Sequence, residues 1–250
     1  MIVKNEIFNG IPALHVFNES MDDSAPITIF LHGFMSAKEH NLHYAYNLVE
    51  KGVRVILPEA LLHGERAQGL NEVEMNLKFW EIVLTSIAEV GVLKQALDER
   101  GLTGKVAVAG TSMGGITTTG CLSKYTWIEA ASILMGAVSY PKLLETQFEQ
   151  LKRDGVPIPL TPEQTAQVKA LLAPYDGYAH ESFLTQVPIY MWHGERDSMV
   201  PISMTKPFIE YLEERRVMHQ ITYVTEPRAG HAVSRKGILA CTAFLAQNLA

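Results

Sequence analysis

The stretch VAVAGTSMGGITTTG, residues 106–120, passes from four small apolar residues into a group of glycines around one serine. Its apolar part predicts a buried strand, and the residues after Ser112 predict a helix. Glycine weakens both kinds of element, so Gly110 and Gly114 need another reason to lie at the junction. The pattern Gly-x-Ser-x-Gly is typical of a sharp turn that exposes the serine hydroxyl. We predict that a Cβ atom at Gly110 or Gly114 would collide across this turn, and that Gly115 lets the helix approach the sheet.

A glycine-rich turn with an incidental serine is the alternative, since five-residue patterns recur by chance. The flanking strand and helix favour a reactive serine.

Strands and helices alternate along the rest of the chain. Apolar runs predict strands at residues 27–33, 53–59, 105–110, 131–136, 187–194 and 220–225. Helical spacing predicts helices near residues 37–51, 71–100, 113–123, 201–215 and 235–249. This order predicts an α/β fold whose mostly parallel central sheet is flanked by helices, with an antiparallel hairpin from residues 1–17 at one edge.

The length of 250 residues and the hydrophobic share of 47% fit a single domain over residues 1–250. The segment from Tyr140 to Gln186 interrupts the alternation, because it holds several prolines and amphipathic pieces near residues 142–153 and 162–172. We predict a helical cap insertion at about 140–186, lying over the strand ends.

The composition restricts the kinds of partner and the cellular compartment that we expect for this protein. The net charge is −6 with both signs interspersed, which argues against a nucleic-acid-binding surface. No apolar run approaches the ~18 residues of a membrane span, and the first residues lack the pattern of a signal peptide. We therefore expect a cytoplasmic protein without nucleic-acid or membrane partners, whose oligomeric state stays open. Cys121 and Cys241 are expected to be buried, reduced thiols.

A serine nucleophile needs a general base, and the base needs an orienting carboxylate. Asp197 follows the strand 187–194, and His231 follows the strand 220–225. The carboxyl ends of parallel strands meet at one edge of a sheet, so Ser112, Asp197 and His231 are predicted to form a catalytic triad. The rival acids fit less well: Glu195 lies too close to the end of its strand, and Glu226 too close to the histidine.

The backbone N–H groups of Met113 and Phe34 are predicted to form the oxyanion hole. Three side chains near these loops are candidate pocket residues: His32, His63 and Arg66. We interpret His32 as a structural histidine that fixes its loop. His63 and Arg66 line the site or brace it through a salt bridge, and bracing is favoured.

Histidines also raise the question of a metal. His-Gly occurs at residues 32–33, 63–64 and 193–194, which suggests either a metal cluster or three strand ends that need glycine. We favour the second. His40 and His43 lie at i and i+3, but no third ligand is obvious, and a solvated helix face is favoured. We predict neither a metal nor a cofactor.

The motifs LHGF (31–34), GTSMGG (110–115), HGERDSMVP (193–201) and AGH (229–231) resemble those of an α/β-hydrolase. The branch is that of prolyl-oligopeptidase-like and dienelactone-hydrolase-like esterases, and the resemblance covers about residues 24–140 and 186–250. It implies a serine hydrolase without a cofactor. Dienelactone-type members use cysteine as nucleophile, so Ser112 favours the esterases and peptidases. A peptidase would normally carry a large propeller domain, for which this chain has no room.

The sequence thus predicts a carboxylic-ester hydrolase that acts on a small-molecule ester, with short acyl chains, through an acyl-enzyme. Two alternatives remain: a small-peptide hydrolase or thioesterase, and a non-catalytic binding protein on the same fold.

Overall fold

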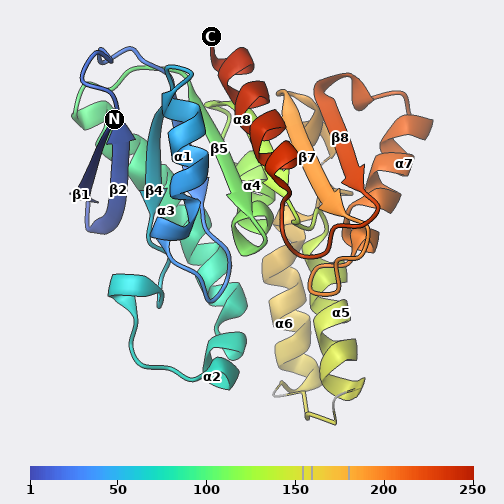
Figure 1. Ribbon diagram of the computed structural model, residues 1–250. Helices are drawn as coiled ribbons and strands as arrows, with labels where there is room; N and C mark the ends of the chain where they lie inside the picture. Colours follow the sequence, from blue (N-terminus) through green and yellow to red (C-terminus); the bar gives the residue numbers. More distant parts are fainter. Residues whose placement is uncertain (154, 159, 180) are drawn as a thin grey trace.

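The computed structural model describes residues 1–153, 155–158, 160–179 and 181–250. Its sheet has the strand order β1-β2-β4-β3-β5-β6-β7-β8. The strands are β1 (Ile2–Phe8), β2 (Ile11–Phe17), β3 (Ile27–Leu31), β4 (Arg54–Pro58), β5 (Val106–Thr111), β6 (Ile128–Leu134), β7 (Ile189–Gly194) and β8 (Ile221–Glu226). From β4 to β8 the neighbours pair in parallel, whereas β1 with β2 and β2 with β4 pair antiparallel (Figure 1). The predicted fold and edge hairpin are therefore confirmed.

Each central strand sends its side chains alternately into two hydrophobic cores. In β5, Val106 and Val108 join one core, while Ala107 and Ala109 join the other. The first core is covered by α3 (Phe79–Glu99), α4 (Met113–Lys124) and α7 (Lys206–Glu214), and the second by α1 (Leu42–Val49) and α8 (Arg235–Leu249). A strand that is buried on both faces has a continuous run of apolar residues, which is why these strands could be predicted from the sequence.

Three predicted helices are divided in the structure. The helix expected near 37–51 begins as a 3₁₀ turn (Lys38–Asn41) and continues as α1. The helix expected at 71–100 divides at Lys78 into α2 (Glu72–Leu77) and α3, because the Lys78 N–H bonds the carbonyl of Met75 in a tightened final turn. The helix expected at 201–215 divides into a 3₁₀ turn (Ile202–Met204) and α7. Pro207 accounts for the break before α7, since it lacks the N–H that a continuous helix would donate to the carbonyl of Ser203 and is tolerated in the first turn of α7.

Three helices extend beyond the carboxyl ends of the strands, at the bottom of Figure 1: α2, α5 (Tyr140–Arg153) and α6 (Pro162–Leu172). The last two match the helical pieces predicted near 142–153 and 162–172. Short 3₁₀ turns at Ala173–Tyr175 and Glu181–Thr185 lead from α6 back toward β7. Within the predicted insertion, Asp154, Pro159 and His180 lie outside the described residues.

The segment carrying α5 and α6 is tied to the rest of the fold by side-chain hydrogen bonds. The Tyr140 hydroxyl donates to the carbonyl of Ile116 in α4 at 2.6 Å. The Trp80 indole of α3 donates to the Gln147 amide oxygen at 2.9 Å. Both bonds join α5 to helices that pack on the sheet.

Cys121 and Cys241 are buried and free, as predicted. Burial raises the pKa of both thiols, that of Cys241 to about 12. No helix in the described part of the chain is long and apolar enough to cross a membrane.

Candidate active site

Ser112 lies in a strained turn between β5 and α4, with φ 55° and ψ −117°. A Cβ atom on Gly110 would collide with the backbone of Gly114, so the predicted collision across the turn is confirmed there. On Gly114 the Cβ atom would instead meet the Leu31 carbonyl of β3. Glycine at these two positions lets β5, α4 and β3 approach closely enough to form the turn. The Ser112 N–H donates to the carbonyl of Leu134, which ties the turn to β6 at 2.8 Å.

His231 follows β8 and reaches the serine across the edge of the sheet. Its Nδ1 lies 2.7 Å from Asp197 Oδ2, and its Nε2 lies 2.8 Å from Ser112 Oγ. A carboxylate can only accept, so Nδ1 carries the proton and Nε2 is left to accept from the Ser112 hydroxyl. The three predicted side chains therefore form one continuous hydrogen-bond chain.

Asp197 is buried in the loop after β7, where both of its carboxylate oxygens are occupied. Oδ2 accepts from His231, and Oδ1 accepts from the backbone N–H groups of Met199 and Val200 at 2.9 Å each. Burial alone would raise the pKa of this carboxyl, but the hydrogen bonds from His231, Val200 and Met199 lower it below its ordinary value. The group is therefore an anion at neutral pH, as the orientation of the imidazole requires.

The two rival acids have other partners. Glu195 Oε1 accepts from the Thr225 hydroxyl at 2.8 Å. Glu226 Oε1 accepts from the Trp192 indole at 3.1 Å and from the Ser234 hydroxyl at 2.5 Å. Asp197 is thus the carboxylate that the structure brings to His231.

The two predicted oxyanion donors lie on either side of the serine. A Cβ atom built on Gly33 would be 3.6 Å from the Ser112 Cβ, which places the loop after β3 beside Ser112. In the part of the chain that the structure describes, the next amide, Phe34 N–H, has no hydrogen-bond acceptor. Met113 begins α4, so its N–H has no acceptor within the helix. Both amides are available to an oxyanion.

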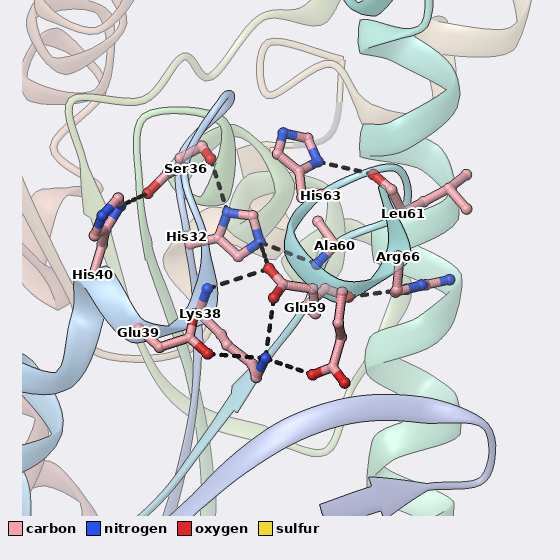
Figure 2. A network of polar contacts seen from close by, with 12 residues as sticks. His32, Ser36, Lys38, Glu39, His40, Glu59, Ala60, Leu61, His63 and Arg66 are labelled. Carbon is pink, nitrogen blue, oxygen red and sulfur yellow. Dashed lines mark hydrogen bonds and ion pairs between the residues drawn. The ribbon is translucent and has the colours of Figure 1, made fainter. Parts of the chain in front are cut away.

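The three candidate pocket residues are engaged with protein groups (Figure 2). His32 Nδ1 bonds the Gly33 carbonyl at 2.8 Å, and the Ala60 N–H donates to its Nε2 at 3.0 Å. Arg66 donates two hydrogen bonds to the Glu89 carboxylate, at 2.9 and 2.7 Å, and a third to the Glu59 carbonyl at 2.9 Å.

His63 Nδ1 bonds the Leu61 carbonyl at 2.8 Å, and its Nε2 accepts from the Met35 N–H at 3.0 Å. These contacts match the bracing interpretation of the candidate pocket residues.

Sequence reasoning missed a buried ion pair beneath this loop. The side chains of Lys38 and Glu59 are only 3% and 1% exposed, with Nζ and Oε2 3.1 Å apart. Burial alone would raise the pKa of Glu59, but its contacts with His32 and Lys38 lower it to about 2. Glu59 directly follows β4, as a strand-end site residue would, but nothing in the sequence marks Lys38 as its partner.

His193 is a second missed residue. It is fully buried in β7, and its Nε2–H donates to the carbonyl of Val200 at 2.7 Å. The Thr205 hydroxyl lies 3.1 Å from its other ring nitrogen, Nδ1. His193 thus holds the loop that presents Asp197, and the His-Gly dipeptide at 193–194 was the signal for it.

The three His-Gly dipeptides are not all strand ends. In the pair at 63–64, His63 precedes and Gly64 begins the 3₁₀ turn Gly64–Arg66, well after β4 has ended at Pro58, so that part of the interpretation was wrong. Among the described residues, no group of three or more His, Cys, Asp or Glu side chains could hold a metal ion. His40 instead bonds the Ser36 hydroxyl at 2.7 Å.

Comparison with known proteins agrees with this geometry. Residues 91–250 match the prolyl oligopeptidase family. Over 242 residues the chain is 40% identical to "Putative esterase YitV" of Bacillus subtilis (strain 168), covering 95% of both chains. It is 30% identical over 248 residues to "Esterase YjfP" of Escherichia coli (strain K12), covering 96% of both. The crystal structure of TT1662 from Thermus thermophilus superposes with a TM-score of 0.75 at 22% identity, covering 100% of this chain and 99% of that one. The chain belongs to the prolyl oligopeptidase family of α/β-hydrolases.

Proposed function

We propose that this protein hydrolyses carboxylic esters through an acyl-enzyme on Ser112. The unbroken hydrogen-bond chain from Asp197 through His231 to the Ser112 hydroxyl carries the proposal. The turn that presents Ser112 and the two free amides beside it supply the other parts that acyl transfer needs. The esterase names of two relatives that align over nearly the whole chain support the same reaction.

In this proposal each group has one role. His231 Nε2 takes the proton as Ser112 Oγ attacks the ester carbonyl, and it then returns that proton to the departing alkoxide. Asp197 keeps Nδ1 protonated and stabilises the imidazolium that forms. The N–H groups of Phe34 and Met113 stabilise the oxyanion of each tetrahedral intermediate. Water activated by the same imidazole then releases the acid and regenerates the serine.

The surroundings of Phe34 favour an apolar substrate group. Its partly buried ring makes edge contacts with Phe79 at 5.4 Å and His63 at 5.6 Å, and Phe79 in turn contacts Trp80 at 5.3 Å. We propose that residues 1–250 form one domain, and that residues 140–186 cap this aromatic wall and limit the acyl chain to a short one. The location of α5 and α6 beyond the strand ends supports the cap (Figure 1).

The test is hydrolysis of p-nitrophenyl acetate, butyrate and octanoate by the wild type and by Ser112→Ala. We expect the wild type to prefer the two shorter esters, and the variant to lose activity by about 10³-fold or more. Equal rates in both proteins would refute the nucleophile, and preference for octanoate would refute the proposed cap.

The same triad chemistry applies to thioesters and anilides, so the leaving group needs its own comparison. A butyryl thioester and an alanine anilide should be assayed beside p-nitrophenyl butyrate at matched concentrations. We expect the oxygen ester to give the highest kcat/KM. A higher value for either alternative would reassign the substrate class while leaving the triad intact.

A further inference from the structure

Two histidines hold the two peptide units on either side of Phe34. The first unit consists of the Gly33 carbonyl and the Phe34 N–H. His32 Nδ1 lies 2.8 Å from the Gly33 carbonyl oxygen, and because that oxygen can only accept, Nδ1 is the donor. The structure contains no cis peptide bond among its described residues, so the N–H of this unit points opposite to its carbonyl. The same carbonyl accepts from the Ser36 N–H at 3.3 Å, so His32 and this turn bond together fix the direction of the Phe34 N–H.

The second unit carries the Phe34 carbonyl and the Met35 N–H, which donates to His63 Nε2 at 3.0 Å. Met35 has a φ of 55°, a left-handed conformation that is unfavourable for a residue with a side chain. Its side chain is exposed, so packing does not hold it there. The Ser36 N–H closes this turn onto the Gly33 carbonyl at 3.3 Å, and the hydrogen bond to His63 fixes the orientation of the Met35 N–H within it.

The partners of His63 determine its protonation state. The Leu61 carbonyl, 2.8 Å from Nδ1, requires a proton on that nitrogen. The Met35 N–H requires a lone pair on Nε2. Only the neutral ring with its proton on Nδ1 satisfies both. A second proton on Nε2 would face the Met35 N–H and break the bond.

We propose that His32 and His63 are positioning residues that aim the Phe34 N–H at the oxyanion, and that His63 does so only as the neutral Nδ1–H tautomer. The effect on catalysis rests on the proposed ester hydrolysis, whereas the effect on the loop does not. Neither histidine touches the substrate in this proposal. Each acts through a backbone amide of residues 33–35.

The electrostatic surroundings keep His63 neutral near pH 7. Two titratable groups face it: the His32 ring, 5.1 Å away between centroids, and Glu59. Burial lowers the pKa of His63 below its ordinary value of 6.5; the Leu61 carbonyl and Glu59 act against this, and His32 acts with it. The loop is therefore held at pH values above this lowered pKa and is released as the pH falls through it.

A matched pair of substitutions separates the two bonds of His63. The amide oxygen of His63→Gln reaches the position of Nε2 and can accept from Met35. The amide of His63→Asn reaches only the position of Nδ1, so it keeps the bond to Leu61 and loses the one to Met35. For p-nitrophenyl butyrate we expect kcat to fall about 10–100-fold in the Asn variant, because a donor worth about 10²–10³ is loosened but not removed. KM should change little, and the Gln variant should stay within about fivefold of the wild type.

Equal losses of kcat in both variants, or a loss confined to KM, would overturn the positioning role. A second measurement does not depend on activity. In protein labelled with ¹⁵N-methionine, the Met35 amide signal is assigned by its absence in Met35→Leu and followed from pH 8 to pH 5. We expect it to titrate below pH 6.5 in the wild type and not in His63→Gln.

The outcomes distinguish the two proposals. If the Met35 amide signal changes neither with pH nor in the His63 variants, the proposed role of the neutral His63 tautomer is refuted, whatever the ester assays give. If the Met35 amide signal titrates but the wild type cleaves no ester, the proposed function is refuted, and the proposal that His63 positions the loop is retained.

Discussion

Replacing Ser112 with glycine should abolish ester hydrolysis and, at the same time, stabilise the fold relative to the alanine variant. At φ 55° and ψ −117° a residue with a Cβ atom is strained, at a cost of about 1–3 kcal/mol. Alanine keeps the Cβ atom and therefore the strain, whereas glycine removes it. Glycine also gives the unfolded chain more freedom, which offsets about 0.4–1 kcal/mol of the gain. Both variants lose the hydroxyl that bonds His231, so that bond cancels in the comparison.

The net difference is about 1 kcal/mol in favour of Ser112→Gly, which corresponds to a Tm about 2–4 °C higher for a chain of this size. Thermal unfolding followed by circular dichroism measures it, with p-nitrophenyl butyrate to check that both proteins are inactive. Ser123, within helix α4, provides the control. There the order should reverse, with Ser123→Gly less stable than Ser123→Ala by about 0.5–1 kcal/mol. A Ser112→Gly protein no more stable than Ser112→Ala would show that the turn is not strained.

Three further predictions concern the site and its supports. Asp197→Asn should lower kcat by about 10⁴-fold, because it favours the wrong imidazole tautomer, whereas Glu195→Gln should keep a kcat close to that of the wild type. A large loss of kcat in Glu195→Gln would show that Glu195, and not Asp197, is the acid of the triad. Glu59→Gln should cost about 1–3 kcal/mol in urea unfolding, because it removes the buried partner of the Lys38 ammonium and leaves that ammonium only the more exposed Glu39 and Glu65. The Glu59 pKa of about 2 lies below its ordinary 4.5, so its stabilisation is full above pH 4.5 and is lost as the pH falls toward 2, which unfolding of wild type and variant across that range can check. Gly114→Ala should unfold or lose several kcal/mol because its Cβ meets a carbonyl of β3, whereas Gly230→Ala, whose Cβ would lie 3.8 Å from its nearest neighbour, should be tolerated.

The parts of the fold and site that could be predicted are those fixed by short-range patterns. Apolar runs revealed the parallel strands, and Ser112, Asp197 and His231 each follow such a run. The geometry of a parallel sheet then brings their side chains to one edge. Their contacts join residues far apart in the sequence, yet the strand ends were enough to anticipate them.

The parts that could not be predicted depend on how two loops cross. Met35 and His63 lie on separate loops, and no local pattern pairs an exposed methionine amide with a buried imidazole. The same holds for Lys38 and Glu59, whose pairing needs the path of the chain after β3. The break before α7 is different, because Pro207 was a readable signal that the helical periodicity of the region obscured.

The segment between β6 and β7 leaves the sheet and returns to it beside its starting point, since the two strands pair directly, Ala131 with Ile189. Doubling its length would cost only about 0.6 kcal/mol in loop-closure entropy, and none of Ser112, Asp197 and His231 belongs to it. With residues 140–186 as the proposed cap, exchange of residues 142–183 should change the range of accepted substrates and leave the contacts among Ser112, Asp197 and His231 in place.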